Sequence, residues 1–223
     1  MKKNIVASSV AALALGLAGA AHAQSAGEVL VKAGWNKIMP KVQSGDLSAP
    51  TLPGSKIDIQ SASALLLTAA YMVTDNVSLE FLGGLPYKHT IVGAGTVAGV
   101  GKIGSIHQIS PTLLVQYRFL PPEGPFRPYL GAGPTLAKFY KSEGSANLTA
   151  VTNPGGSPTT IGGRTDWGFS LEAGANYKID KHWFVDAAVL KTFISTKSRM
   201  STGQEISAKL NPVSVNASIG YAF

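Results

Sequence analysis

The sequence predicts an all-β protein, an eight-stranded antiparallel up-and-down transmembrane β-barrel formed by residues 24–223. Three observations predict it. The 223-residue chain is 45% hydrophobic and only 14% charged, which argues against a disordered chain because enough apolar surface exists to offset the ordering entropy. After residue 23, no apolar run reaches the roughly 20 residues that a membrane-spanning helix needs. Several segments instead alternate apolar and polar residues with the period of two that indicates β-strands.

Residues 1–23 have the pattern of a cleaved signal peptide. A basic start at Lys2 and Lys3 precedes a long apolar run, and Ala21 and Ala23 are the small residues that suit a signal-peptidase site. A retained membrane anchor is the alternative. The pattern predicts export to a bacterial envelope.

Eight predicted strands follow. The last is the most regular, since every second residue from Val213 to Phe223 is apolar and the residues between them are small or polar. In order, the strands cover residues 28–39, 57–73, 77–88, 106–119, 127–140, 164–179, 182–196 and 209–223. An even number lets a closed meander begin and end on the same side.

The connections between these strands alternate in length. Short turns are predicted at residues 74–76, 120–126 and 180–181, and long loops at residues 40–56, 89–105, 141–163 and 197–208. Bacterial outer-membrane barrels have short periplasmic turns and longer loops outside. The alternation therefore predicts the cell outer membrane as the location, with outer-membrane lipid and lipopolysaccharide as surroundings.

Alternation alone does not say which face meets lipid, because a soluble barrel would point its apolar face inward. Three features favour the membrane. The Gly- and Ser-rich face suits a lumen that eight strands leave only wide enough for side chains. Aromatic residues gather near strand ends, as interfacial girdles do. The chain also ends on Tyr221 and Phe223, which we predict to be the signal for the outer-membrane assembly machinery.

Five motifs carry a family resemblance. They are Lys32-Ala33-Gly34-Trp35-Asn36, Tyr71-Met72-Val73-Thr74-Asp75-Asn76, Leu85-Pro86-Tyr87-Lys88-His89, Pro111-Thr112-Leu113-Leu114-Val115-Gln116-Tyr117 and Arg127-Pro128-Tyr129-Leu130-Gly131-Ala132-Gly133. In content and order the chain resembles the OmpW family of outer-membrane proteins, except at residues 141–164, whose role stays open. The resemblance implies an eight-stranded barrel, passage of small, mainly hydrophobic molecules and no enzymatic activity.

With the polar face inward, the ionisable lumen residues balance three against three. They are Lys32, Glu80, Arg118, Glu172, Lys178 and Asp186. Because isolated buried charges are costly, we expect these residues to pair into a floor that closes the periplasmic half of the lumen. Above the floor, small or apolar positions predict a cup for an apolar solute. They include Ala62, Ala64, Gly84, Thr112 and Leu190. Alternatively, they only fill a tight core.

A closed floor would require an apolar solute to leave sideways into the bilayer. Pro86, Pro111 and Pro134 fall in consecutive predicted strands, and each removes a backbone donor from the sheet. The three prolines therefore mark a possible lateral gate. The alternative is that Pro86 and Pro111 simply mark strand ends.

No catalytic, cofactor or metal site is predicted. The chain has no Cys, and its histidines lie on separate elements without a carboxylate at ligand spacing. Removal of Lys2 and Lys3 lowers the net charge from +7 to +5, too weak an excess to indicate nucleic acid. The leading prediction is a facilitator of hydrophobic solute passage, and the alternative is a structural or surface-receptor barrel with a closed lumen.

Overall fold

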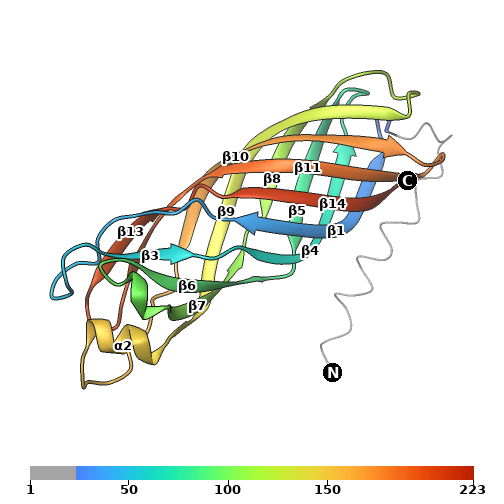
Figure 1. Cartoon of the computed structure of the whole chain (residues 1–223). Coiled ribbons are helices and arrows are strands. Elements are labelled where there is room, and N and C mark those ends of the chain that lie inside the picture. The colour runs from blue at the N-terminus through green and yellow to red at the C-terminus, as the bar shows by residue number, and fades with distance from the viewer. Residues whose placement is uncertain (1–23) are drawn as a thin grey trace, which may run out of the picture.

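The computed structural model describes residues 24–223, so the predicted signal peptide lies outside the described residues. The chain forms an elongated barrel that continues at one end into long hairpins (Figure 1). Among the described residues, no helix is long and apolar enough to cross a membrane.

Eight antiparallel strands close the barrel, as the sequence predicts. In order around the barrel they are β1 (Val29–Met39), β4 (Ala62–Met72), β5 (Val77–Gly84), β8 (Thr112–Arg118), β9 (Phe126–Gly144), β10 (Thr165–Lys178), β11 (Trp183–Phe193) and β14 (Val213–Ala222). Closure comes from the pairing of β1 with β14, which runs without interruption from Leu30↔Ala222 to Met39↔Val213. The predicted fold is therefore confirmed.

The two ends of the barrel differ. The short-turn end carries the turns around residues 74–76, 120–125 and 179–182. At the other end, here called the hairpin end, β3 (Ser55–Ile59), β6 (Tyr87–Gly95) and β7 (Lys102–Ile109) continue the wall from β9. A separate sheet there contains β2 (Gln43–Ser44), β12 (Ser195–Arg199) and β13 (Glu205–Lys209).

Three predicted loops are thus largely regular structure, and that part of the prediction was wrong. Residues 89–105 belong mostly to β6 and β7 around the short 3-10 helix η1 (Ala98–Val100), and residues 197–208 belong mostly to β12 and β13. Within 141–163, β9 ends and helix α2 (Ala146–Thr152) follows, with Ser145 Oγ accepting the Leu148 N–H as its N-cap. Backbone pairing satisfies these donors and acceptors while apolar side chains pack between the hairpins.

The side chains are arranged in the opposite sense to those of a water-soluble protein. Trp167 is 72% exposed, whereas Arg118 and Arg127 are fully buried in the lumen. Exposed apolar residues surround the whole barrel, and aromatic rings gather at the short-turn end. The aromatic residues there are Tyr71, Tyr117, Phe119, Tyr177, Trp183 and Tyr221. An apolar outer band with an aromatic girdle is the surface that hydrocarbon requires.

Candidate functional site

A buried ion network fills the lumen toward the short-turn end. Lys32 Nζ lies 2.9 Å from Glu80 Oε1 and 3.2 Å from Asp186 Oδ1. Arg118 approaches Glu80 Oε2 at 3.9 Å. All four side chains are buried. Because buried charges are tolerated only when they are paired and hydrogen-bonded, each of these groups depends on the others.

Tyr129 fills the space between the two cations. Its ring centroid lies 5.7 Å from Lys32 Nζ and 5.0 Å from Arg118 Cζ, and its hydroxyl donates to Asp186 Oδ2 at 2.9 Å. Space for the ring comes from Gly174, where an added Cβ would lie 2.5 Å from the Tyr129 ring. At this level side chains, rather than water, occupy the lumen.

Glu172 joins the network through an amide. Gln116 Nε2 donates to Glu172 Oε2 at 2.6 Å, and Gln116 Oε1 accepts from Arg118 at 2.9 Å. Among the described residues Glu172 forms no ion pair. The sixth predicted floor residue, Lys178, is not part of the network. It is the last residue of β10, and its ammonium group reaches the turn and donates to the Pro122 carbonyl.

Arg127 closes the base of the barrel, a role that the sequence analysis missed. It is fully buried and donates to the carbonyl oxygens of Gln24, at 2.6 Å, and Asp75. The alternation of β9 carries the missing signal, since Arg127 is two residues before Tyr129 and therefore on the same face. Between this base and the ion network lies an apolar cluster of Leu30, Ala70, Met72, Phe184 and Ala222.

Above the ion network, Leu82, Leu114 and Leu190 form a layer across the lumen, here called the leucine layer. The cavity above it has a volume of about 50 Å³. One water needs about 10–15 Å³ of such space, so the cavity is only large enough for a few waters and is too small for an open channel.

This middle cavity differs from the predicted apolar cup. Gly84, Thr112 and Leu190 line it. Ala62 and Ala64 do not, because they pack behind two residues that do line it, Ile38 and Tyr87. Polar side chains also line it, including Asn36, Gln108, Ser110, Thr135, Thr192 and Ser214. The cup is therefore part polar, because alternate inward positions of several strands carry hydroxyl or amide groups.

The most apolar space lies higher, between the hairpins. This second cavity, here called the apolar chamber, has a volume of about 40 Å³. Its lining includes Ile57, Ile59, Ile91, Ile103, Ile106, Phe139, Ile161, Met200, Ile206 and Leu210. Half of these residues come from segments predicted to be loops, so the sequence analysis missed the chamber. The available signal was an isolated isoleucine or two in each of these otherwise polar or Gly-rich segments, which does not by itself indicate a shared core.

The wall beside the middle cavity contains a stretch where one strand ladder is interrupted. Pairing of β5 with β8 ends at Leu82↔Thr112, and pairing of β6 with β7 begins only at Tyr87↔Gln108. Residues 83–86 and 109–111 therefore face each other without a strand ladder, and we call this stretch the seam. Gly83, Gly84, Leu85 and Ser110 also line the middle cavity, so the cavity reaches the wall there.

The three prolines lie at or near the seam. Pro86 and Pro111 are at strand ends within it, not inside strands as the gate hypothesis assumed. Pro134 lies inside β9, at a point where the pairing of β8 with β9 skips from Thr112↔Thr135 to Val115↔Ala132. The prolines thus coincide with the interruptions in hydrogen bonding that proline imposes.

The C-terminal aromatics lie at the short-turn end. The ring of Tyr221 stacks on His182 at a centroid distance of 5.2 Å and contacts the edges of Trp183 at 5.0 Å and Phe223 at 4.8 Å. Their role as an assembly signal stays a prediction.

Comparisons with known proteins agree with this geometry. The model of the OmpW family matches residues 25–223. Outer membrane protein W of Vibrio cholerae serotype O1 is 33% identical over 195 residues, covering 87% of this chain and 85% of that protein. The dibenzothiophene metabolism operon protein PahQ of Pseudomonas aeruginosa is 28% identical over 180 residues, 79% of each chain. The crystal structure of OprG from Pseudomonas aeruginosa superposes with a TM-score of 0.81 at 26% identity, covering 92% of this chain and 99% of that one.

Proposed function

The chain belongs to the OmpW family of outer-membrane proteins, and from this premise we propose that it facilitates the passage of small, mainly hydrophobic molecules, which leave sideways into the bilayer. The observation that carries the proposal is the sequence of layers in the lumen. An apolar chamber leads toward a cavity that touches the seam, while the ion network below is closed.

The proposed route begins outside the cell. Outer-membrane barrels keep their short turns on the periplasmic side, so the hairpin end faces outward and a solute enters through the apolar chamber. Apolar side chains receive an apolar solute at little desolvation cost. A solute that moved further down would have to pass the leucine layer and displace the paired charges of the ion network. A solute that left through the seam would enter the hydrocarbon of the membrane directly.

The name of one relative supports an apolar cargo. PahQ is named for an operon of dibenzothiophene metabolism, and dibenzothiophene is a largely apolar heteroaromatic compound. A second relative, DoxH of Pseudomonas sp. strain C18, is named for the same kind of operon, whereas outer membrane protein W of Vibrio cholerae is named only for its location.

Uptake into liposomes across a series of solutes of graded hydrophobicity tests the proposal. We expect the protein to accelerate uptake of apolar solutes and to leave charged solutes of similar size unchanged. Faster passage of charged solutes would indicate an aqueous pore. No acceleration of any solute would favour the structural or surface-receptor barrel instead.

Crosslinking tests the exit through the seam. The chain has no Cys, so an introduced pair of cysteines can be crosslinked selectively. The variant Leu85→Cys/Ser110→Cys, bridged by a short reagent with two thiol-reactive groups, should lock the seam and reduce apolar uptake. The control is Val189→Cys/Val215→Cys, whose residues pair directly across the continuous ladder of β11 and β14. Equal uptake by the two crosslinked proteins would remove the seam from the mechanism.

The prolines give a second test of the seam. Pro111→Ala together with Pro134→Ala restores two backbone donors to the wall. We expect apolar uptake to fall as the wall pairs more completely. Unchanged uptake would mean that the prolines only terminate strands.

A further inference from the structure

Lysines mark the upper border of the apolar belt. Four strands that run toward the hairpin end have a lysine on the outer face. On each of them the lysine is the first charged residue after the exposed or half-buried apolar residues. The four are Lys37 after Trp35, Lys88 after Leu85, Lys138 after Leu136 and Lys191 after Val189. The lysines therefore lie just outside the hydrocarbon core of the membrane, at the height where lipid phosphates are expected.

Two of these border lysines, Lys88 on β6 and Lys138 on β9, lie on the two strands that flank β7. In the register of β6, β7 and β9, Lys88 is opposite His107, and His107 is opposite Tyr140. Lys138 lies two residues before Tyr140 and so shares its face. The rings of His107 and Tyr140 are 5.9 Å apart. Because β7 separates their strands, the two backbones are about 10 Å apart, a gap that two extended lysine side chains can span above this ring pair.

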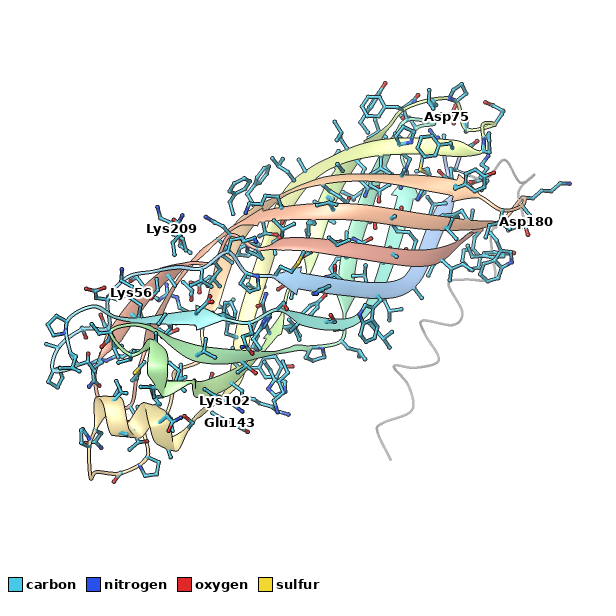
Figure 2. All side chains as sticks on the ribbon, viewed as in Figure 1. Lys56, Asp75, Lys102, Glu143, Asp180 and Lys209 are labelled. Atoms are coloured by element: carbon cyan, nitrogen blue, oxygen red, sulfur yellow. The ribbon has the colours of Figure 1, made fainter. Side chains whose placement is uncertain are left out.

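Neither Lys88 nor Lys138 forms an ion pair among the described residues. Other cations of the hairpin end do, since Lys56 lies 3.8 Å from Asp46 and Lys197 lies 2.6 Å from Glu205. Figure 2 labels Lys56, Lys102 and Lys209 at the hairpin end together with Glu143, and Asp75 and Asp180 at the short-turn end. Among the described residues the cluster on β6, β7 and β9 therefore presents positive charge without an ion pair, and the acidic residue further along β9, Glu143, accepts from Ser105 instead.

Directly below the cluster the wall is apolar. On β9 the outward residues are Pro134 and Leu136, and Leu136 pairs with Trp167, which is 72% exposed. An ammonium pair above such a wall matches a molecule with an anionic head and hydrocarbon chains. A free phosphate ion would leave the apolar part unused.

We propose that Lys88, Lys138, His107 and Tyr140 bind a phosphate group of an outer-leaflet phosphoglycolipid of the lipid A type, whose acyl chains lie along Pro134, Leu136 and Trp167. Ammonium and hydroxyl groups donate to the phosphate oxygens, and hydrogen bonds between charged groups are the stronger ones. The site borders the seam, because Lys138 pairs with Ile109. The proposal depends on the outer-membrane location and not on transport.

The test compares lipid binding by matched variants. Wild-type protein, Lys88→Gln/Lys138→Gln and the control Lys37→Gln/Lys191→Gln are reconstituted in phosphatidylcholine nanodiscs that contain a small fraction of lipid A, and retained lipid A is counted by native mass spectrometry. The control removes the same charge at the same height. We expect the Lys88→Gln/Lys138→Gln affinity to fall by about tenfold, and the control to stay near wild type. Equal losses in the two variants, or no loss, would overturn the site.

Further arms identify the ligand. Lys88→Arg/Lys138→Arg should keep binding, because guanidinium groups also bind phosphate. Wild-type protein should bind dephosphorylated lipid A only weakly. Its affinity for that lipid should match the affinity of the Lys88→Gln/Lys138→Gln variant for intact lipid A. Equally strong retention of phosphatidylglycerol, or full competition by millimolar inorganic phosphate, would contradict the assignment to a phosphoglycolipid. Circular dichroism and gel mobility before and after heating establish that each variant is folded.

Discussion

The two halves of the lumen solve different physical problems. Toward the short-turn end, charges, amides and Tyr129 are paired within a continuous strand ladder. Toward the hairpin end, the lumen contains two small cavities, an apolar lining and an interrupted ladder at residues 83–86. The first half resists substitution because removing any one of these side chains would leave its partner buried without a hydrogen bond or an opposite charge. The second has free volume and unpaired backbone.

This difference locates rigidity and motion. Segments with few backbone hydrogen bonds open at lower free energy than continuous ladders do. At the seam one ladder is missing beside the middle cavity, although Gly84 still pairs with β4 and the Pro111 carbonyl still accepts from Leu136 of β9. Under the proposed exit through the seam, the ion network would be the half that keeps the barrel closed while the seam opens.

The comparison predicts its largest effect at Lys32. Replacing it as Lys32→Met leaves Glu80 and Asp186 buried without their cation. Breaking a buried pair on one side costs about 3–5 kcal/mol, which we expect as a lower free energy of unfolding in urea with lipid vesicles. The triple change Lys32→Met/Glu80→Gln/Asp186→Asn removes the stranded charges and should recover part of the loss. A Lys32→Met protein as stable as wild type would mean that the network does not hold the lower half.

Gly174 gives the next largest effect. Gly174→Ala places a Cβ 2.5 Å from the Tyr129 ring and 2.7 Å from the Ala188 Cβ. Overpacking of this kind costs about 1–3 kcal/mol. The same urea titration measures it, with Ala173→Val as the control because residue 173 faces outward on the same strand. If Gly174→Ala unfolds at the wild-type urea concentration, the lower lumen has more space than the structure indicates.

A substitution in the upper half should affect uptake more than stability. Leu190→Trp fills the middle cavity, which Leu190 lines, and should reduce apolar uptake to near background at a stability cost of about 1–3 kcal/mol. Val189→Trp is the matched control, since Val189 is 47% exposed on the lipid face. Normal uptake with Leu190→Trp would place the solute route elsewhere.

The same contrast explains what the sequence could predict. Strict alternation gave the eight strands and the inward position of Lys32, Glu80, Arg118, Glu172 and Asp186, because the side-chain period of a strand is fixed. Which of these residues touch depends on the stagger between strands that are distant in sequence. Alternation contains no information about that stagger.

The hairpin end shows where this reasoning stops. The apolar chamber brings together Ile57, Ile91, Ile161 and Ile206 from four separate connections, and no single segment reveals that they share a core. Lys178 was misplaced for a related reason, because a long side chain at a strand end reaches the turn instead of the lumen. Length and glycine content predicted loops where paired hairpins form.

The smallest predicted effect belongs to the short-turn end itself. Asp180 Oδ1 accepts the backbone N–H groups of His182 and Trp183, each at 2.8 Å. These hydrogen bonds, that of Trp183 first, hold the pKa of Asp180 below its ordinary value of 3.8. A carboxyl group whose pKa is lower in the folded state stabilises the fold above its unfolded pKa, and this contribution disappears as the pH falls through the folded value. Asp180→Asn should therefore weaken the turn slightly at pH 7 and match wild type once the pH is well below 3.8. Urea unfolding at both pH values, with Lys181→Gln as the control in the same turn, measures the difference. A wild-type advantage that persists unchanged in acid would show that the carboxylate charge does not stabilise this turn.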